Sequence, residues 1–144
     1  MPGKVPADLM DIVLSLTAII EEETGRLLTP GRDPELGEIA AAKGQLVAAL
    51  EARGATLARE RPEWMSELEA SERTRLAVLV RDLNQASILN ARVLQRQIDL
   101  SSEMMAAVAA EAQRASGARN AIYGQHGALS CTDQAAPISV NAKL

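Results

Sequence analysis

The chain has 144 residues, of which 47% are hydrophobic, yet it holds no Phe, one Trp and one Tyr; the apolar residues are mostly Ala, Leu, Ile, Val and Met. This composition favours helices over strands, and the length suits one all-α domain. A net charge of −4 without a basic cluster argues against nucleic-acid binding. The single Cys and the lack of a signal-like N-terminus or of an apolar run of roughly 20 residues predict a cytoplasmic protein without membrane insertion.

The first periodic segment predicts a helix over residues 6–29. Its apolar residues recur at steps of three and four, which places them on one helix face. Pro30 and Gly31 mark a tight connection after it. Glu23 interrupts this stripe near its end, and the stripe itself consists of Leu9, Ile12, Val13, Leu16, Ile19, Ile20 and Leu27.

A second helix is predicted over residues 34–60. Asp33 can accept hydrogen bonds from the free N–H groups of a first turn, and Pro34 has no N–H group to leave unpaired. Gly54 weakens this helix by up to about 1 kcal/mol relative to Ala. The helix should end before Pro62, because the residue that precedes a proline is disfavoured in the α region.

The third helix is the longest, predicted over residues 63–116. It begins either at Pro62 or at a capping box formed by Ser66 and Glu69, and Gly117 is well placed to close it. About 50 helical residues span roughly 75 Å. Residues 1–117 are therefore expected to form the helical domain, and residues 118–144, which lack periodicity, a flexible C-terminal tail.

The unequal helix lengths suggest a function. Three helices joined by short connections pack as an antiparallel bundle, and the first two, each about 35 to 42 Å long, cover only half of the third. The overhanging half still carries an apolar stripe, so the tail, a second copy of the chain or a foreign helix should cover it. Methionines suit surfaces that accept differently shaped partners. The stripe contains Val93, Leu94, Ile98, Met104, Met105 and Val108.

Two segments carry a resemblance to a known family. Residues 79–94 (LVRDLNQASILNARVL) place Asn90 in an N-x-x-x-L context, and residues 122–129 (IYGQHGAL) contain a YG-x-x-G element. With three amphipathic helices in a chain of this size, the sequence resembles the FlgN-type flagellar export chaperones. The last helix is richer in Ala than is typical of that family, and the chain ends in Ala-Lys-Leu rather than in a polar run.

The resemblance implies a definite function. Such chaperones bind the C-terminal segments of the hook–filament junction (hook-associated) proteins in the cytoplasm, prevent their premature association and deliver them to the export gate of the flagellar type III apparatus. By position, Tyr123 and Gly124 would dock at the gate. The residues that would bind the substrate protein are Asn90, Val93, Leu94, Ile98, Met104, Met105 and Val108.

Other readings of single residues stay open. Asn90 can instead fix helix register, as a buried Asn does in coiled coils, and Tyr123 can fold back onto the stripe. A phosphorelay role for His126 or a catalytic role for Cys131 lacks the helical placement or the activating neighbours that such chemistry needs. We therefore expect no enzyme activity, cofactor or metal site. The main alternative to a chaperone is a homodimeric helical-bundle adaptor whose stripe pairs with its own copy.

Overall fold

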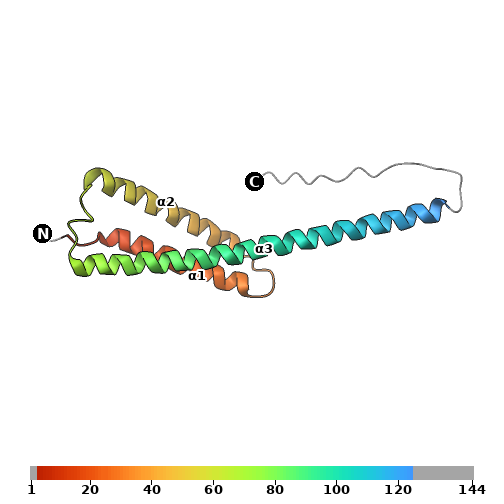
Figure 1. Cartoon of the computed structure of the whole chain (residues 1–144), viewed down its shortest axis with the longest axis horizontal. Coiled ribbons are helices and arrows are strands. Elements are labelled where there is room, and N and C mark those ends of the chain that lie inside the picture. Colours follow the sequence, from red (N-terminus) through yellow and green to blue (C-terminus); the bar gives the residue numbers. More distant parts are fainter. Residues whose placement is uncertain (1–2, 125–144) are drawn as a thin grey trace. The chain divides into compact units, whose positions relative to one another are not determined.

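The structure, a computed structural model, describes residues 3–124 (Figure 1). These residues form three α-helices and no strand: α1 (Ala7–Leu28), α2 (Leu36–Glu60) and α3 (Ala70–Gly124). The predicted all-α class is confirmed, and the third helix is the longest, as expected. The chain divides into two units at Leu100, so that residues 3–100 hold the packed helices and residue 101 onward holds the rest of α3.

Polar contacts define the helix directions in the first unit. Along α1, Asp8 pairs with Arg53 of α2 and Glu23 pairs with Lys43, so the residue numbers run in opposite senses and the two helices are antiparallel. Between α1 and α3, Asn90 lies 67 residues after its partner Glu23. The same separation joins the Val5 backbone N–H, just before α1, to the Glu72 carboxylate. The first and third helices are therefore parallel, with α2 antiparallel to both.

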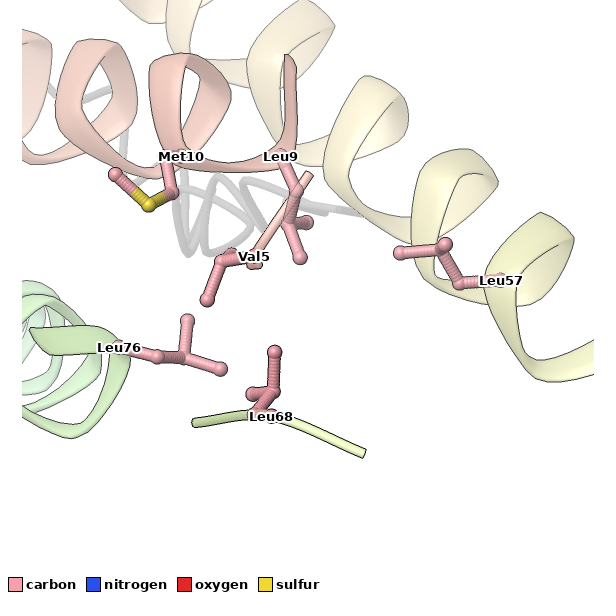
Figure 2. Close-up of a cluster of buried hydrophobic side chains, with 6 residues drawn as sticks. All are labelled: Val5, Leu9, Met10, Leu57, Leu68 and Leu76. Carbon is pink, nitrogen blue, oxygen red and sulfur yellow. The ribbon is translucent and has the colours of Figure 1, made fainter. Parts of the chain in front are cut away.

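The core lies where the three helices meet. Figure 2 shows a cluster of buried side chains from the start of α1 and the residues just before it, from the C-terminal end of α2, and from the start of α3 and the residues just before it. Trp64 packs against this cluster. A second cluster lies further along, where Leu16 and Ile20 of α1 contact Ala86 of α3. The first cluster consists of Val5, Leu9, Met10, Leu57, Leu68 and Leu76.

The third helix begins at Ala70, later than the predicted residue 63. Residues 62–67 form successive turns, and the hydroxyl of Ser66 donates to the Glu63 carbonyl (2.8 Å) instead of capping with Glu69. A contact with the N-terminus holds this segment: the Gly3 N–H donates to the Glu67 carbonyl (3.0 Å), and the Glu69 N–H donates to the Gly3 carbonyl (3.2 Å). A long-range contact therefore sets the start of the helix.

The third helix also ends later than predicted. It continues through Gly117 to Gly124, so Gly117 is an interior residue and the expected tail begins at least seven residues later than 118. One glycine costs a helix only about 1 kcal/mol, and the Ala-rich sequence on either side has high helix propensity. The tail expected for residues 125–144 lies outside the described residues.

The connection between α1 and α2 is held by local chemistry. Gly31 adopts a φ of 106°, which a glycine tolerates without a steric penalty. The Asp33 carboxylate accepts the Glu35 N–H (2.9 Å), as its position before the helix predicts. Arg26 at the end of α1 binds Glu22 (2.8 Å), Glu35 (2.6 Å) and Asp33 (3.2 Å). These hydrogen bonds, the one from Glu22 first, raise the pKa of Arg26, so it stays charged at any working pH.

Candidate functional site

The residues expected to bind a substrate protein fall into two groups. Asn90 and Val93 are buried within the first unit, with exposed fractions of 6% and 8%. Leu94 is half-buried and marks the limit of the packed region. Every residue from 95 to 119 is exposed. The large apolar side chains in that stretch are Ile98, Leu100, Met104, Met105 and Val108.

Asn90 forms the centre of a polar cluster that joins all three helices. Its Nδ2 donates to Oε2 of Glu23 (2.8 Å) and to Oγ1 of Thr24 (3.1 Å). Nζ of Lys43 lies 2.5 Å from the same Glu23 oxygen and 3.4 Å from Oδ1 of Asn90. Glu23 is only 4% exposed and Thr24 5%. The Asn90 amide thus makes hydrogen bonds with a carboxylate, a hydroxyl and an ammonium group inside the bundle.

The assignment of Asn90 and Val93 to substrate binding is therefore corrected. Both side chains are occupied by contacts within the chain, because α1 extends far enough to cover this part of α3. The alternative hypothesis, that Asn90 fixes the helix register, fits its position between three helices. The sequence signal for the cluster was Glu23, a polar residue within an otherwise apolar stripe, and Lys43 takes a similar place among the apolar residues of α2. Thr24 carried no such signal.

The exposed residues retain the spacing of a single helix face. At 100° per residue, Leu94, Ile98, Met105 and Val108 fall within an arc of about 80°, and Met104 lies about 40° beyond it. Ile98 is 57% exposed, Met104 70% and Val108 69%. An amphipathic pattern therefore continues from the half-buried Leu94 into residues 95–119, which no other part of the described chain covers. We call Leu94, Ile98, Met104, Met105 and Val108 the α3 stripe.

The proposed gate-docking residues lie at the end of the described chain. Tyr123 and Gly124 are the last two residues of α3. The remainder of the YG-x-x-G element lies outside the described residues, as do His126 and Cys131. The docking role of Tyr123 and Gly124 stays a prediction.

One surface feature was not expected from the sequence. A shallow groove of about 550 Å³ lies beside the end of α1, where Leu28 is 62% exposed next to Val93. Arg92 and Arg96 line the same groove. Leu28 is the last residue of α1 and lies outside the predicted apolar stripe, but the pattern gave no reason to expect a groove beside α3 at this point.

Within residues 3–124, no three His, Cys, Asp or Glu side chains gather closely enough to hold a metal ion. Nor does any helix of the described chain combine the length and apolar character needed to cross a membrane.

Comparisons with protein families, with curated proteins and with solved structures found no match to this chain. Function must therefore be argued from the surface itself.

Proposed function

We propose that this protein is a cytosolic chaperone of the flagellar type III export system. It binds the C-terminal helical segments of hook–filament junction proteins along α3, prevents their premature association and delivers them to the export gate. No catalytic step is part of this function.

The observation that carries the proposal is the α3 stripe. Its apolar residues lie at three- and four-residue spacing on a helix whose described residues from 95 to 119 are all exposed. A partner helix with the same spacing would bury them by helix-in-groove packing. The adjacent Met104 and Met105 are flexible enough to accept two different junction proteins. The flagellar identity of the partner is supported by the resemblance of residues 79–94 and 122–129 to the FlgN-type chaperones.

Titration with synthetic C-terminal segments of the junction proteins tests the proposal. We expect saturable binding by calorimetry, and a loss of at least about 2 kcal/mol of binding free energy in Met105→Asp or Ile98→Asp, since a charge would enter an apolar interface. Ala110→Asp is the matched control, because residue 110 lies roughly 140° from Met105 around the helix. Equal binding by all three variants would contradict the proposal.

The homodimeric adaptor is the competing outcome. A chaperone should sediment as a monomer, or as a weak dimer, until substrate is added, whereas an adaptor should dimerise through the same residues. If Met105→Asp converts a stable dimer to a monomer and no junction segment binds, the adaptor function replaces the chaperone.

The gate-docking role is tested separately. We expect Tyr123→Ala to leave the affinity for a junction segment unchanged while reducing secretion of the junction protein by flagellated cells. A loss of substrate affinity in Tyr123→Ala would show instead that Tyr123 belongs to the substrate surface.

A further inference from the structure

Helix α2 contributes little to the core. Of its 25 residues only Ile39 and Leu57 are buried, whereas α1 buries seven of its 22. Leu46 and Leu50 are half-buried at the edge of the second cluster. Because burial of apolar area is the main source of packing stability, α2 draws less from it than α1, and it is held to α1 in part by the ion pairs of Lys43 with Glu23 and of Arg53 with Asp8.

The glycines of α2 weaken it further without serving its packing. A methyl group added at Gly37, Gly44 or Gly54 would meet no atom within 4 Å. None of the three is therefore needed to let another segment approach. Each nonetheless lowers the helix-forming equilibrium about fivefold relative to Ala.

Both ends of α2 are attached to the bundle independently of the helix itself. Before it, Arg26 of α1 binds Asp33 and Glu35. After it, Gly3 pairs with Glu67 and Glu69. These contacts do not involve residues 36–60, so they do not depend on the position of α2.

The face beneath α2 has a specific chemical requirement. Glu23 is 4% exposed, and its carboxylate is bound by the Lys43 ammonium group and by the Asn90 amide. Departure of α2 removes the only cation of this cluster. Any helix that takes its place must supply another, because a carboxylate left unpaired in an apolar surrounding is strongly disfavoured.

We infer that α2 is a displaceable helix, and that the α1–α3 face beneath it binds an amphipathic helix from another protein that carries a lysine or arginine opposite Glu23. This site is separate from the α3 stripe and does not depend on the proposed function. The displacing helix needs apolar residues at the spacing of Ile39, Leu46, Leu50 and Leu57, with the cation in the register of Lys43.

Hydrogen exchange of the full-length protein tests the first half of the inference. We expect the amides of α2 to exchange at least about tenfold faster than those of α1 and of residues 74–94 of α3. The triple variant Gly37→Ala, Gly44→Ala, Gly54→Ala should slow exchange in α2 by on the order of a hundredfold, the product of three fivefold effects. Uniform exchange across the three helices, showing only global opening, would overturn the inference.

A peptide in trans tests the second half. The probe is a fluorescently labelled peptide of residues 34–61, the helix whose fit to this face is known. We expect saturable binding to the full-length protein by anisotropy, at least about tenfold weaker binding of the Lys43→Met peptide, and on the order of a hundredfold weaker binding to the triple Ala variant. No binding, or equal binding to the parent and triple Ala proteins, would overturn the docking site.

The α3 stripe supplies the control that separates the two proposals. Met105→Asp should leave both α2 exchange and peptide binding unchanged, since residue 105 is not part of the face beneath α2. A failure of junction-segment binding together with a successful peptide experiment would remove the chaperone function alone.

Discussion

At the residue scale, Glu23, Lys43 and Asn90 show how a polar cluster is tolerated inside an apolar core. Each makes its hydrogen bonds to the others, and one comes from each helix. A one-turn slip of any helix would leave a charge or an amide buried without a partner, at a cost of several kcal/mol. The cluster therefore selects one register among those that the apolar stripes alone would allow.

Removing two members of the cluster together should cost less than the sum of removing each alone. We expect Lys43→Met to lower the free energy of unfolding by about 1–3 kcal/mol, because the Glu23 carboxylate stays buried without its cation. The double variant Glu23→Gln, Lys43→Met should lose less than the sum of the two single variants. Urea unfolding of all four proteins measures the coupling, and strict additivity would show that the pair does not interact.

Gly3 should be more sensitive to substitution than its place near the N-terminus suggests. A methyl group at residue 3 would lie 2.9 Å from the Glu67 carbonyl oxygen. We expect Gly3→Ala to destabilise the protein by about 1–3 kcal/mol through this overlap. Gly37→Ala is the matched control and should be neutral or stabilising, because its position is open. Thermal unfolding of both variants decides the matter.

At the scale of elements, helix ends set by local signals were predictable. The connections at Pro30-Gly31 and Arg61-Pro62 lie in the sequence itself, and α1 and α2 end within one residue of their predicted C-termini. The start of α3 was predicted seven residues early, because the contact of Gly3 with Glu67 leaves no trace in the periodicity. Gly117 was predicted to end the third helix, but no turn follows it and α3 continues to Gly124.

The candidate site was predicted only in part, because its extent depends on a long-range contact, as the start of α3 does. Periodicity identifies the apolar face of α3 but not how much of it is covered. Coverage depends on the offset between α1 and α3, which the contact of Glu23 with Asn90 sets. This offset places Asn90 and Val93 inside the bundle and leaves Ile98 and the residues after it exposed.

The boundary along α3 predicts opposite responses to one substitution. Val93→Asp should destabilise the fold by about 3 kcal/mol or more, since it buries a charge in the bundle. Ile98→Asp, five residues later, should change stability by no more than about 1 kcal/mol, because the side chain is 57% exposed. Circular-dichroism melts compare the two. A collapse of the fold in Ile98→Asp would show that the stripe belongs to the core.

At the scale of the whole molecule, the two units differ in kind. All the interhelical contacts described above lie within residues 3–100, whereas residues 101–119 are exposed throughout. A segment with no buried side chains contributes little to cooperative unfolding. Its apolar residues therefore contribute little to the stability of the first unit, and the role we propose for them is binding.

Truncation tests this division directly. A chain of residues 1–100 should melt within about 2 °C of the full-length protein, because none of the residues 101–119 is buried. The same truncation should abolish binding of a junction segment. A large drop in melting temperature would show that residues beyond 100 support the bundle.

The pairing of α1 with α3 also has a consequence during synthesis. Val5 and Glu23 find their partners 67 residues further along the chain. At a synthesis rate of about 5–20 residues per second, a nascent α1 waits roughly 3 to 13 seconds for them. Helix α2 emerges from the ribosome during that interval and is the first segment able to cover the apolar face of α1. A helix that buries few of its own residues can serve as this temporary cover and still let α3 dock when it arrives.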